Sequence, residues 1–215
     1  EILGLDALGH VFSLPVGRCR LVAGLSGRLA HAPAAVAVPE MGPRRSRIPL
    51  APSQLRMWFG NRLDPDSGAY NIAFAVHFDG ALDVAALRAA VGDVVARHEA
   101  LRTRYPSDAD GPYQQIQAAP EDPLRCTTRP ADAAAQRLRE LARTGFDLTA
   151  ELPLRTELIQ TGPARYALAV VVHHIAADGW SMRPLTADLI TAYRARSTGT
   201  APGWPALPAQ FADYS

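Results

Sequence analysis

The stretch that decides the fold runs from Leu168 to Trp180 and reads Leu-Ala-Val-Val-Val-His-His-Ile-Ala-Ala-Asp-Gly-Trp. Its first five residues are apolar, mostly β-branched and uncharged, which predicts a strand that is buried on both faces. Gly179 then breaks the pattern. Because side chains alternate along a strand, His173 and His174 should point to opposite sides, so at most one of them faces a substrate.

A histidine at the mouth of a strand suits proton transfer near neutral pH, because its unperturbed pKa is about 6.5. A metal site built from His173, His174 and Asp178 is not expected, since adjacent strand histidines diverge and no cysteine or third histidine lies nearby. The remaining alternative is a pair of buried histidines hydrogen-bonded in a core. The Asp-Gly-Trp-Ser continuation argues against that alternative.

Three segments together resemble one enzyme family. The pattern His-His-x-x-x-Asp-Gly is formed here by His173, His174, Asp178 and Gly179. It resembles the active-site motif of nonribosomal peptide synthetase condensation domains, which are relatives of the chloramphenicol acetyltransferase fold. Leu50–Phe59 resembles the first motif of that family, and Arg97–Tyr105 resembles its second. The three motifs follow one another in the order of the family.

The resemblance implies an α/β fold: a chloramphenicol acetyltransferase-like lobe in which helices pack a mixed sheet. Residues 50–215 would form the N-terminal lobe of a condensation domain, with the second lobe absent and with Leu207–Tyr214 similar to the lead-in to it. A fragment of this kind is not expected to be active alone. Residues 31–49 are rich in Ala, Pro and Arg and read as an extended linker. Residues 1–30 weakly resemble the C-terminal tail of a peptidyl carrier domain; the alternative is a short amphipathic helix.

The periodicity of the apolar residues predicts the individual elements. Helices are expected over Pro52–Arg62, from Asp83 through Val94, over Asp132–Arg143, and after Ser181 as a cap. Strands are expected over Tyr70–Phe78, Tyr113–Gln117 and Leu154–Gln160. We expect these elements to surround one sheet.

The activity implied by the resemblance is amide-bond formation. A donor aminoacyl or peptidyl thioester would be attacked by the amine of a second aminoacyl thioester, both held on 4'-phosphopantetheine arms of carrier domains. His174 would position the amine or accept its proton, with His173 in the same motif. Asp178 would support the loop through an ion pair with Arg102 and would not touch the substrate. The stretch Gly179-Trp180-Ser181-Met182 resembles the condensation subtype that joins an L-configured donor to an L-configured acceptor.

Three neighbouring residues have more than one interpretation. Gly179 would provide a bend or a close approach that a Cβ blocks, or serve only as a turn. Its amide and the helix start at Ser181 would face a developing oxyanion. Trp180 would pack in the core or, with Ser181, bind the substrate.

Composition limits the partners. The chain has 215 residues, 48% of them hydrophobic, and a net charge of +1, so it offers no electrostatic footprint for nucleic acid or an anionic membrane. Cys19 and Cys126 lie too far apart in the sequence for a zinc motif. No stretch reaches the roughly 18 apolar residues of a membrane span, and Glu1 and Asp6 stand where a secretory signal would be positive, so a cytoplasmic setting is expected.

The resemblance implies upstream and downstream peptidyl carrier domains and an adenylation domain of the same assembly line as partners, with no cofactor bound directly. Two other functions remain open at this point. One is a related acyltransferase that acts on a free small-molecule acceptor. The other is a non-catalytic remnant that only docks carrier domains.

Overall fold

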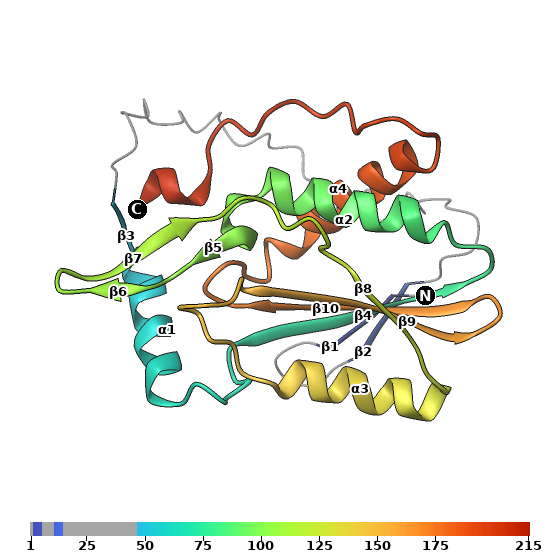
Figure 1. Ribbon diagram of the computed structural model, residues 1–215, viewed down its shortest axis with the longest axis horizontal. Helices are drawn as coiled ribbons and strands as arrows, with labels where there is room; N and C mark the ends of the chain where they lie inside the picture. The colour runs from blue at the N-terminus through green and yellow to red at the C-terminus, as the bar shows by residue number, and fades with distance from the viewer. Residues whose placement is uncertain (1, 6–10, 15–46) are drawn as a thin grey trace, which may run out of the picture.

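A mixed six-stranded sheet forms the centre of the molecule. The structure, a computed structural model, describes residues 2–5, 11–14 and 47–215 (Figure 1). The strands lie in the order β2 (Val11–Leu14), β1 (Ile2–Leu5), β4 (Asn71–Asp79), β10 (Arg165–His173), β9 (Leu154–Gly162) and β8 (Arg125–Thr128). Only β8 and β9 pair in parallel; the other neighbours are antiparallel. The mixed sheet that the sequence predicts is therefore confirmed.

The strand predicted to be buried on both faces lies inside the sheet. Residues 168–172 belong to β10, which has β4 on one side and β9 on the other. Leu168, Ala169, Val171 and Val172 are at most 2% exposed. A run without polar residues fits this position, because helices cover both of its faces.

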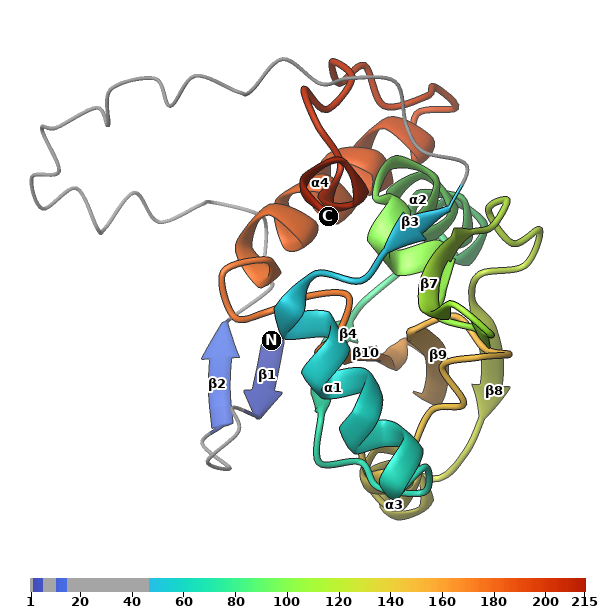
Figure 2. The same ribbon diagram turned by 90° about the vertical axis from the view of Figure 1, so that its left-hand side faces the viewer.

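Within the part of the chain that the structure describes, four helices and two short 3₁₀ turns accompany the sheet. The helices are α1 (Pro52–Leu63), α2 (Val84–Arg97), α3 (Ala131–Arg143) and α4 (Met182–Arg196), and the 3₁₀ turns are η1 (Glu99–Arg102) and η2 (Phe211–Tyr214). All four predicted helices are confirmed to within a few residues. Asp83 caps α2 as expected, since its carboxylate accepts a hydrogen bond from the Ala86 amide at 2.9 Å. In the two views, α2 and α4 lie over one face of the sheet and α3 lies over the other (Figures 1 and 2).

The expectation of a single sheet is wrong. Four short strands form a second sheet: β3 (Ile48–Pro49), β5 (Thr103–Arg104), β6 (Ser107–Asp108) and β7 (Gly111–Ile116). The predicted strand Tyr113–Gln117 corresponds to β7, which pairs with the other three. Three of these strands have only two residues, too few to produce a periodic pattern in the sequence. Ile48 and Pro49, which the sequence assigns to the linker, form one of them.

Alternation along β10 divides the core into two halves. Ala169 and Val171 pack with Trp58 and Phe146 on the side of α1 and α3. Leu168 packs on the opposite side, below α2 and α4. The two histidines at the end of β10 continue this alternation, which therefore decides the face on which each one lies.

The carrier-domain tail expected over residues 1–30 and the linker expected over residues 31–49 fall mostly outside the described residues. The strands β1 and β2 were not predicted from the sequence. β1 pairs with β4 at Phe74, Ala75 and Val76.

Candidate active site

The two histidines lie on opposite faces of the sheet, as the alternation predicts. His173 is 1% exposed. His174 is exposed and lines a cavity of about 900 Å³ that lies on the side of α2 and α4. Only His174 is therefore accessible to a substrate on that side.

His173 has a buried environment that keeps its ring neutral. Its Nδ1 accepts a hydrogen bond from the Ile175 amide at 3.1 Å, which assigns the ring proton to Nε2. The rings of Tyr70 and Phe146 lie 5.8 and 6.0 Å away between centroids. Burial, with a smaller contribution from the charge of His174, lowers the pKa of His173 to about 4. This residue holds the turn that follows β10, and its position in the core keeps it away from the cavity that His174 lines.

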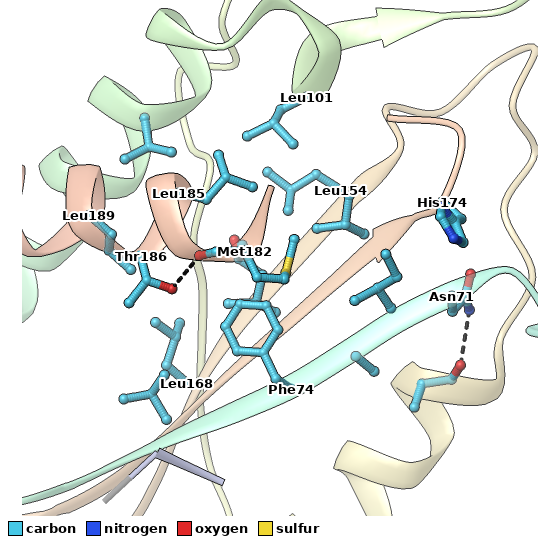
Figure 3. Close-up of a pocket in the computed structure, with 18 of the residues that line it drawn as sticks. Asn71, Phe74, Leu101, Leu154, Leu168, His174, Met182, Leu185, Thr186 and Leu189 are labelled. Atoms are coloured by element: carbon cyan, nitrogen blue, oxygen red, sulfur yellow. Dashed lines mark hydrogen bonds between the residues drawn. The ribbon is translucent and has the colours of Figure 1, made fainter. Parts of the chain in front are cut away.

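His174 stands where β10 ends, at one end of the cavity. Its amide donates a hydrogen bond to the Tyr70 carbonyl at 2.8 Å, which continues the pairing of β10 with β4 by one residue. Figure 3 shows His174 and Asn71 at one end of the cavity and Leu168 and Leu189 at the other. The cavity is lined mainly by apolar side chains of β4, β10, α2 and α4.

The three family motifs meet directly behind the histidines. Gln54 of the first motif donates hydrogen bonds to the Ile175 carbonyl at 3.2 Å and to the Tyr105 hydroxyl at 3.4 Å. Trp58 donates to the Tyr105 carbonyl at 2.8 Å. Burial raises the pKa of the Tyr105 phenol, so it remains protonated. The sequence did not single out Gln54, because Ser53 and Arg56 are polar residues of the same motif and the pattern does not rank the three.

The expected ion pair between Arg102 and Asp178 is wrong. Asp178 Oδ1 instead accepts hydrogen bonds from the Ser181 amide at 2.9 Å and the Ser181 hydroxyl at 2.7 Å. The Ser181 hydroxyl in turn accepts from the Asp178 amide at 3.1 Å. The hydrogen bonds from Ser181 hold the pKa of the Asp178 carboxyl below its usual value. A partner three residues away, with both an amide and a hydroxyl to offer, satisfies the carboxylate locally.

Arg102 has a different set of partners. Its guanidinium donates to the Gln117 carbonyl and, at 3.5 Å, to the Ala96 carbonyl. It also lies 3.7 Å from the Glu99 carboxylate. Arg102 therefore ties η1 to the ends of α2 and β7, and does not contact the loop of His174.

The residues after Asp178 correct four further expectations. A Cβ on Gly179 would have no atom within 4 Å, so no close approach requires a glycine there. The Ser181 amide already donates to Asp178 and is not available to an oxyanion, and the Ser181 side chain does not cap α4 although it stands at the N-cap. Trp180 is 91% exposed, which excludes core packing. Close approach occurs instead at Gly145, where a Cβ would lie 2.0 Å from the Pro65 carbonyl oxygen.

Asn71 forms part of the cavity rim and was missed from the sequence. Its side-chain amide donates to the carbonyls of Ala142 and Thr144, both at 2.9 Å. Carbonyls at the end of a helix lack partners within the helix, and Asn71 supplies one. The residue thereby joins the start of β4 to the end of α3 beside His174.

Among residues 2–5, 11–14 and 47–215, no three His, Cys, Asp or Glu side chains gather closely enough to bind a metal ion. Within the same residues, no helix combines the length and the apolar character needed to cross a membrane.

The exposed imidazole of His174 thus stands at the mouth of an apolar cavity, on a sheet packed by helices. The family model described as "Condensation domain" matches residues 44–215. The chain belongs to this family.

Curated relatives agree with that assignment. The chain is 41% identical, over its whole length, to a dimodular nonribosomal peptide synthase of Bacillus subtilis. It is 46% identical over 80% of its length to an isonitrile lipopeptide synthase of Mycobacterium tuberculosis. It spans only 9% and 7% of these two proteins.

Solved structures show the same fold. The X-domain from teicoplanin biosynthesis matches with 42% identity and a TM-score of 0.76, over 80% of this chain and 38% of that one. The first condensation domain of the CDA synthetase matches with 29% identity and a TM-score of 0.65, over 75% of this chain and 43% of that one. The described lobe thus corresponds to less than half of a solved relative.

Proposed function

We propose that this chain supplies the histidine-bearing lobe of a condensation domain that joins two carrier-bound groups through an amide bond. The donor is an aminoacyl or peptidyl thioester, and the acceptor is an aminoacyl thioester, each on the 4'-phosphopantetheine arm of a peptidyl carrier domain. An adenylation domain of the same assembly line would load a carrier. We also include in the proposal the cytoplasmic setting and the L-to-L subtype.

The reaction needs one base and a precise alignment of two substrates. The acceptor nitrogen attacks the thioester carbonyl carbon, a C–N bond forms, and the C–S bond breaks. His174 accepts one proton from the nitrogen, and that proton leaves with the pantetheine thiol. Because a thioester is already activated, alignment and a positioned base account for most of the acceleration.

The observation that carries the proposal is the position of the His174 imidazole. It is the exposed member of the pair, it lies at the mouth of a cavity of about 900 Å³, and its neighbour His173 is sealed in the core. The Asp178–Ser181 hydrogen bonds shape the loop on the other side of this mouth. Trp180 is fully available to contact a substrate or a carrier there.

Replacing His174 by alanine in the complete synthetase tests the proposal. We expect amide formation to fall by about 10²- to 10⁴-fold, the usual contribution of a positioned base. The matched control is His77→Ala, because His77 of β4 does not line the cavity. Unchanged turnover in His174→Ala would refute the role of this imidazole. Turnover with a free amine but not with a carrier-bound one would identify an acyltransferase of the other type.

A further inference from the structure

We propose that a second cavity, which lies beside the second motif, is a binding site for a small aliphatic carboxylate. This cavity has a volume of about 370 Å³ and is distinct from the cavity that His174 lines. The inference goes beyond the amide-forming reaction. It assigns a task to Arg104 of β5, the one charged residue of the second motif that has no partner in the described part of the chain.

The guanidinium of Arg104 is the observation that points to a ligand. The other charged side chains of the second motif are paired. Arg97 and His98 bind Asp188 of α4 at 2.9 and 2.8 Å, and Arg102 has two backbone carbonyls and a carboxylate as partners. Among the described residues, Arg104 has neither a hydrogen-bond nor an ion-pair partner, although its Nε is buried and the side chain lines the cavity. A buried donor without an acceptor is costly, and an anion is the acceptor that a guanidinium binds best.

The charges in the lining favour a carboxylate over a phosphate. Asp122 and Glu151 line the same cavity, and each is already paired: Asp122 with Arg88, and Glu151 with Arg155 at 2.8 Å. The lining therefore offers one unpaired cation close to two carboxylates. A phosphate group, with a charge of about −2, would be repelled by these carboxylates, whereas a monoanion is balanced by the single guanidinium.

The remaining lining is apolar and limits the size of the ligand. Apolar residues come from α2, from the segment before β8 and from the segment before β9: Val95, Pro120, Pro123, Ala150, Leu152 and Leu154. A water molecule occupies about 30 Å³ of liquid, so the cavity holds roughly ten to twelve groups of that size. A branched carboxylic acid of about five or six carbons fits this limit. Free branched-chain amino acids and short branched fatty acids share this chemistry.

The second cavity adjoins the cavity of His174. Val95 and Leu154 line both cavities and so form the partition between them. The Pro153 carbonyl, next to this partition, accepts a hydrogen bond from the His173 amide at 2.9 Å. Substitutions in the partition would therefore disturb both cavities. The test uses residues that line only the second one.

The test measures the binding of 4-methylpentanoate to the complete synthetase by isothermal titration calorimetry. Arg104→Met removes the charge, and we expect it to weaken binding by at least about tenfold, the usual effect of losing a hydrogen-bonded charged partner. Ala150→Trp places a large ring at an exposed position of the same lining and should weaken binding to a similar extent. Arg139→Met, on the exposed side of α3 and outside the lining, is the matched control and should bind as the wild type does.

Amide formation checks that the variants are folded. It should be unchanged in all three, because none of the three residues lines the cavity of His174. Binding of the ligand at other domains of the synthetase is the same in every variant and cancels in the comparison.

Three further ligands test the chemistry of the site. The uncharged 4-methylpentanamide should bind at least about tenfold more weakly than the acid. Acetate should also bind at least about tenfold more weakly, because each buried methylene contributes about fourfold. Leucine distinguishes the two sources. Arg104-dependent binding that is tighter than that of 4-methylpentanoate identifies a free amino acid, whose ammonium would face Asp122 or Glu151, and weaker binding identifies a fatty acid.

The inference is overturned if the wild type does not bind 4-methylpentanoate. It is equally overturned if Arg104→Met and Ala150→Trp bind this acid as tightly as Arg139→Met does. Neither result bears on the proposed function, which depends on amide formation alone.

Discussion

At the scale of single residues, the chain places two neighbouring imidazoles in opposite environments. His173 is desolvated and neutral, whereas His174 is exposed to the cavity. The alternation of a strand predicted this separation without any structure. It could not predict which partner Asp178 would choose, because the sequence does not rank a serine three residues away against an arginine of another motif.

Protonation of His173 should make stability depend on pH. Its folded pKa of about 4 lies below the unfolded value of about 6.5, so the unfolded chain binds more protons between these two values. Its contribution is complete above pH 6.5 and is lost as the pH falls. We expect the free energy of unfolding to decrease by about 1.5 kcal/mol from pH 6.5 to pH 5 through this residue. Urea denaturation of the wild type and of His173→Leu at several pH values measures this decrease. The prediction would be contradicted if the free energy of unfolding changed equally with pH in the two proteins.

The loop of Asp178 should be coupled to Ser181 and not to Arg102. Asp178→Ala removes hydrogen bonds of the kind that cap a helix, so we expect a cost of about 1 kcal/mol in unfolding free energy. A double-mutant cycle with Ser181→Ala should give a clear interaction energy, and a cycle with Arg102→Ala should give none. A loss of about 3 to 5 kcal/mol in Asp178→Ala, typical of a broken buried ion pair, would be inconsistent with this geometry.

At the scale of elements, α3 is attached to the sheet by a buried carboxylate. Glu157 of β9 is 2% exposed and accepts hydrogen bonds from Arg137 of α3 at 3.0 and 3.1 Å and from Thr127 at 2.9 Å. Burial opposes ionisation of Glu157, but these hydrogen bonds outweigh it and hold the pKa below its usual value. The helix, the sheet and the edge strand β8 therefore meet at one carboxylate.

Removing the cation should loosen this attachment. Arg137→Ala leaves the Glu157 carboxylate buried and unpaired, and we expect a loss of about 3 kcal/mol in unfolding free energy. Arg139→Ala, on the exposed side of the same helix, is the control. Because the Glu157 pKa is lowered, the stabilisation should be present at neutral pH and disappear as the pH falls through the folded pKa. Thermal unfolding at neutral pH and at a pH below the folded pKa of Glu157 tests this direction. Equal melting temperatures for Arg137→Ala and Arg139→Ala at neutral pH would exclude the attachment.

Element prediction succeeded where a periodic pattern was long. The strands β4, β9 and β10 and all four helices have at least nine residues, so their apolar periods stand out. The two-residue strands β3, β5 and β6 have no period, and only tertiary pairing with β7 creates them. The cavity was equally invisible, because it depends on how far α4 stands from the sheet.

At the scale of the whole molecule, the chain after α4 returns across α2 (Figure 1). The Arg97 guanidinium lies 4.7 Å from the centre of the Trp204 ring and donates to the Pro205 carbonyl at 2.6 Å. Gln210 donates to the Arg97 carbonyl at 2.9 Å and accepts from the Glu99 amide at 3.2 Å. The second motif therefore fixes the returning segment as well as α4.

Loss of the Trp204 ring should release this segment locally. We expect Trp204→Ala to lower global stability by only about 1 kcal/mol, the scale of a partly exposed cation–π contact. Hydrogen exchange of the amides in residues 205–214 should become faster, because the segment depends on the end of α2 for its contacts. Protection equal to the wild type in this segment would argue against the anchor.

Because side chains alternate between the two faces of the sheet along β10, the number of residues in this strand decides which histidine faces the cavity. Deleting a single residue between Ala167 and Val171 would shift the register with β4 by one residue. Every following side chain of β10 would then lie on the opposite face of the sheet. The dry, uncharged imidazole would then emerge at the opening, and the solvated one would be driven against Phe146. No side chain would have been altered chemically, yet the imidazole proposed to accept the proton would be sealed in the core.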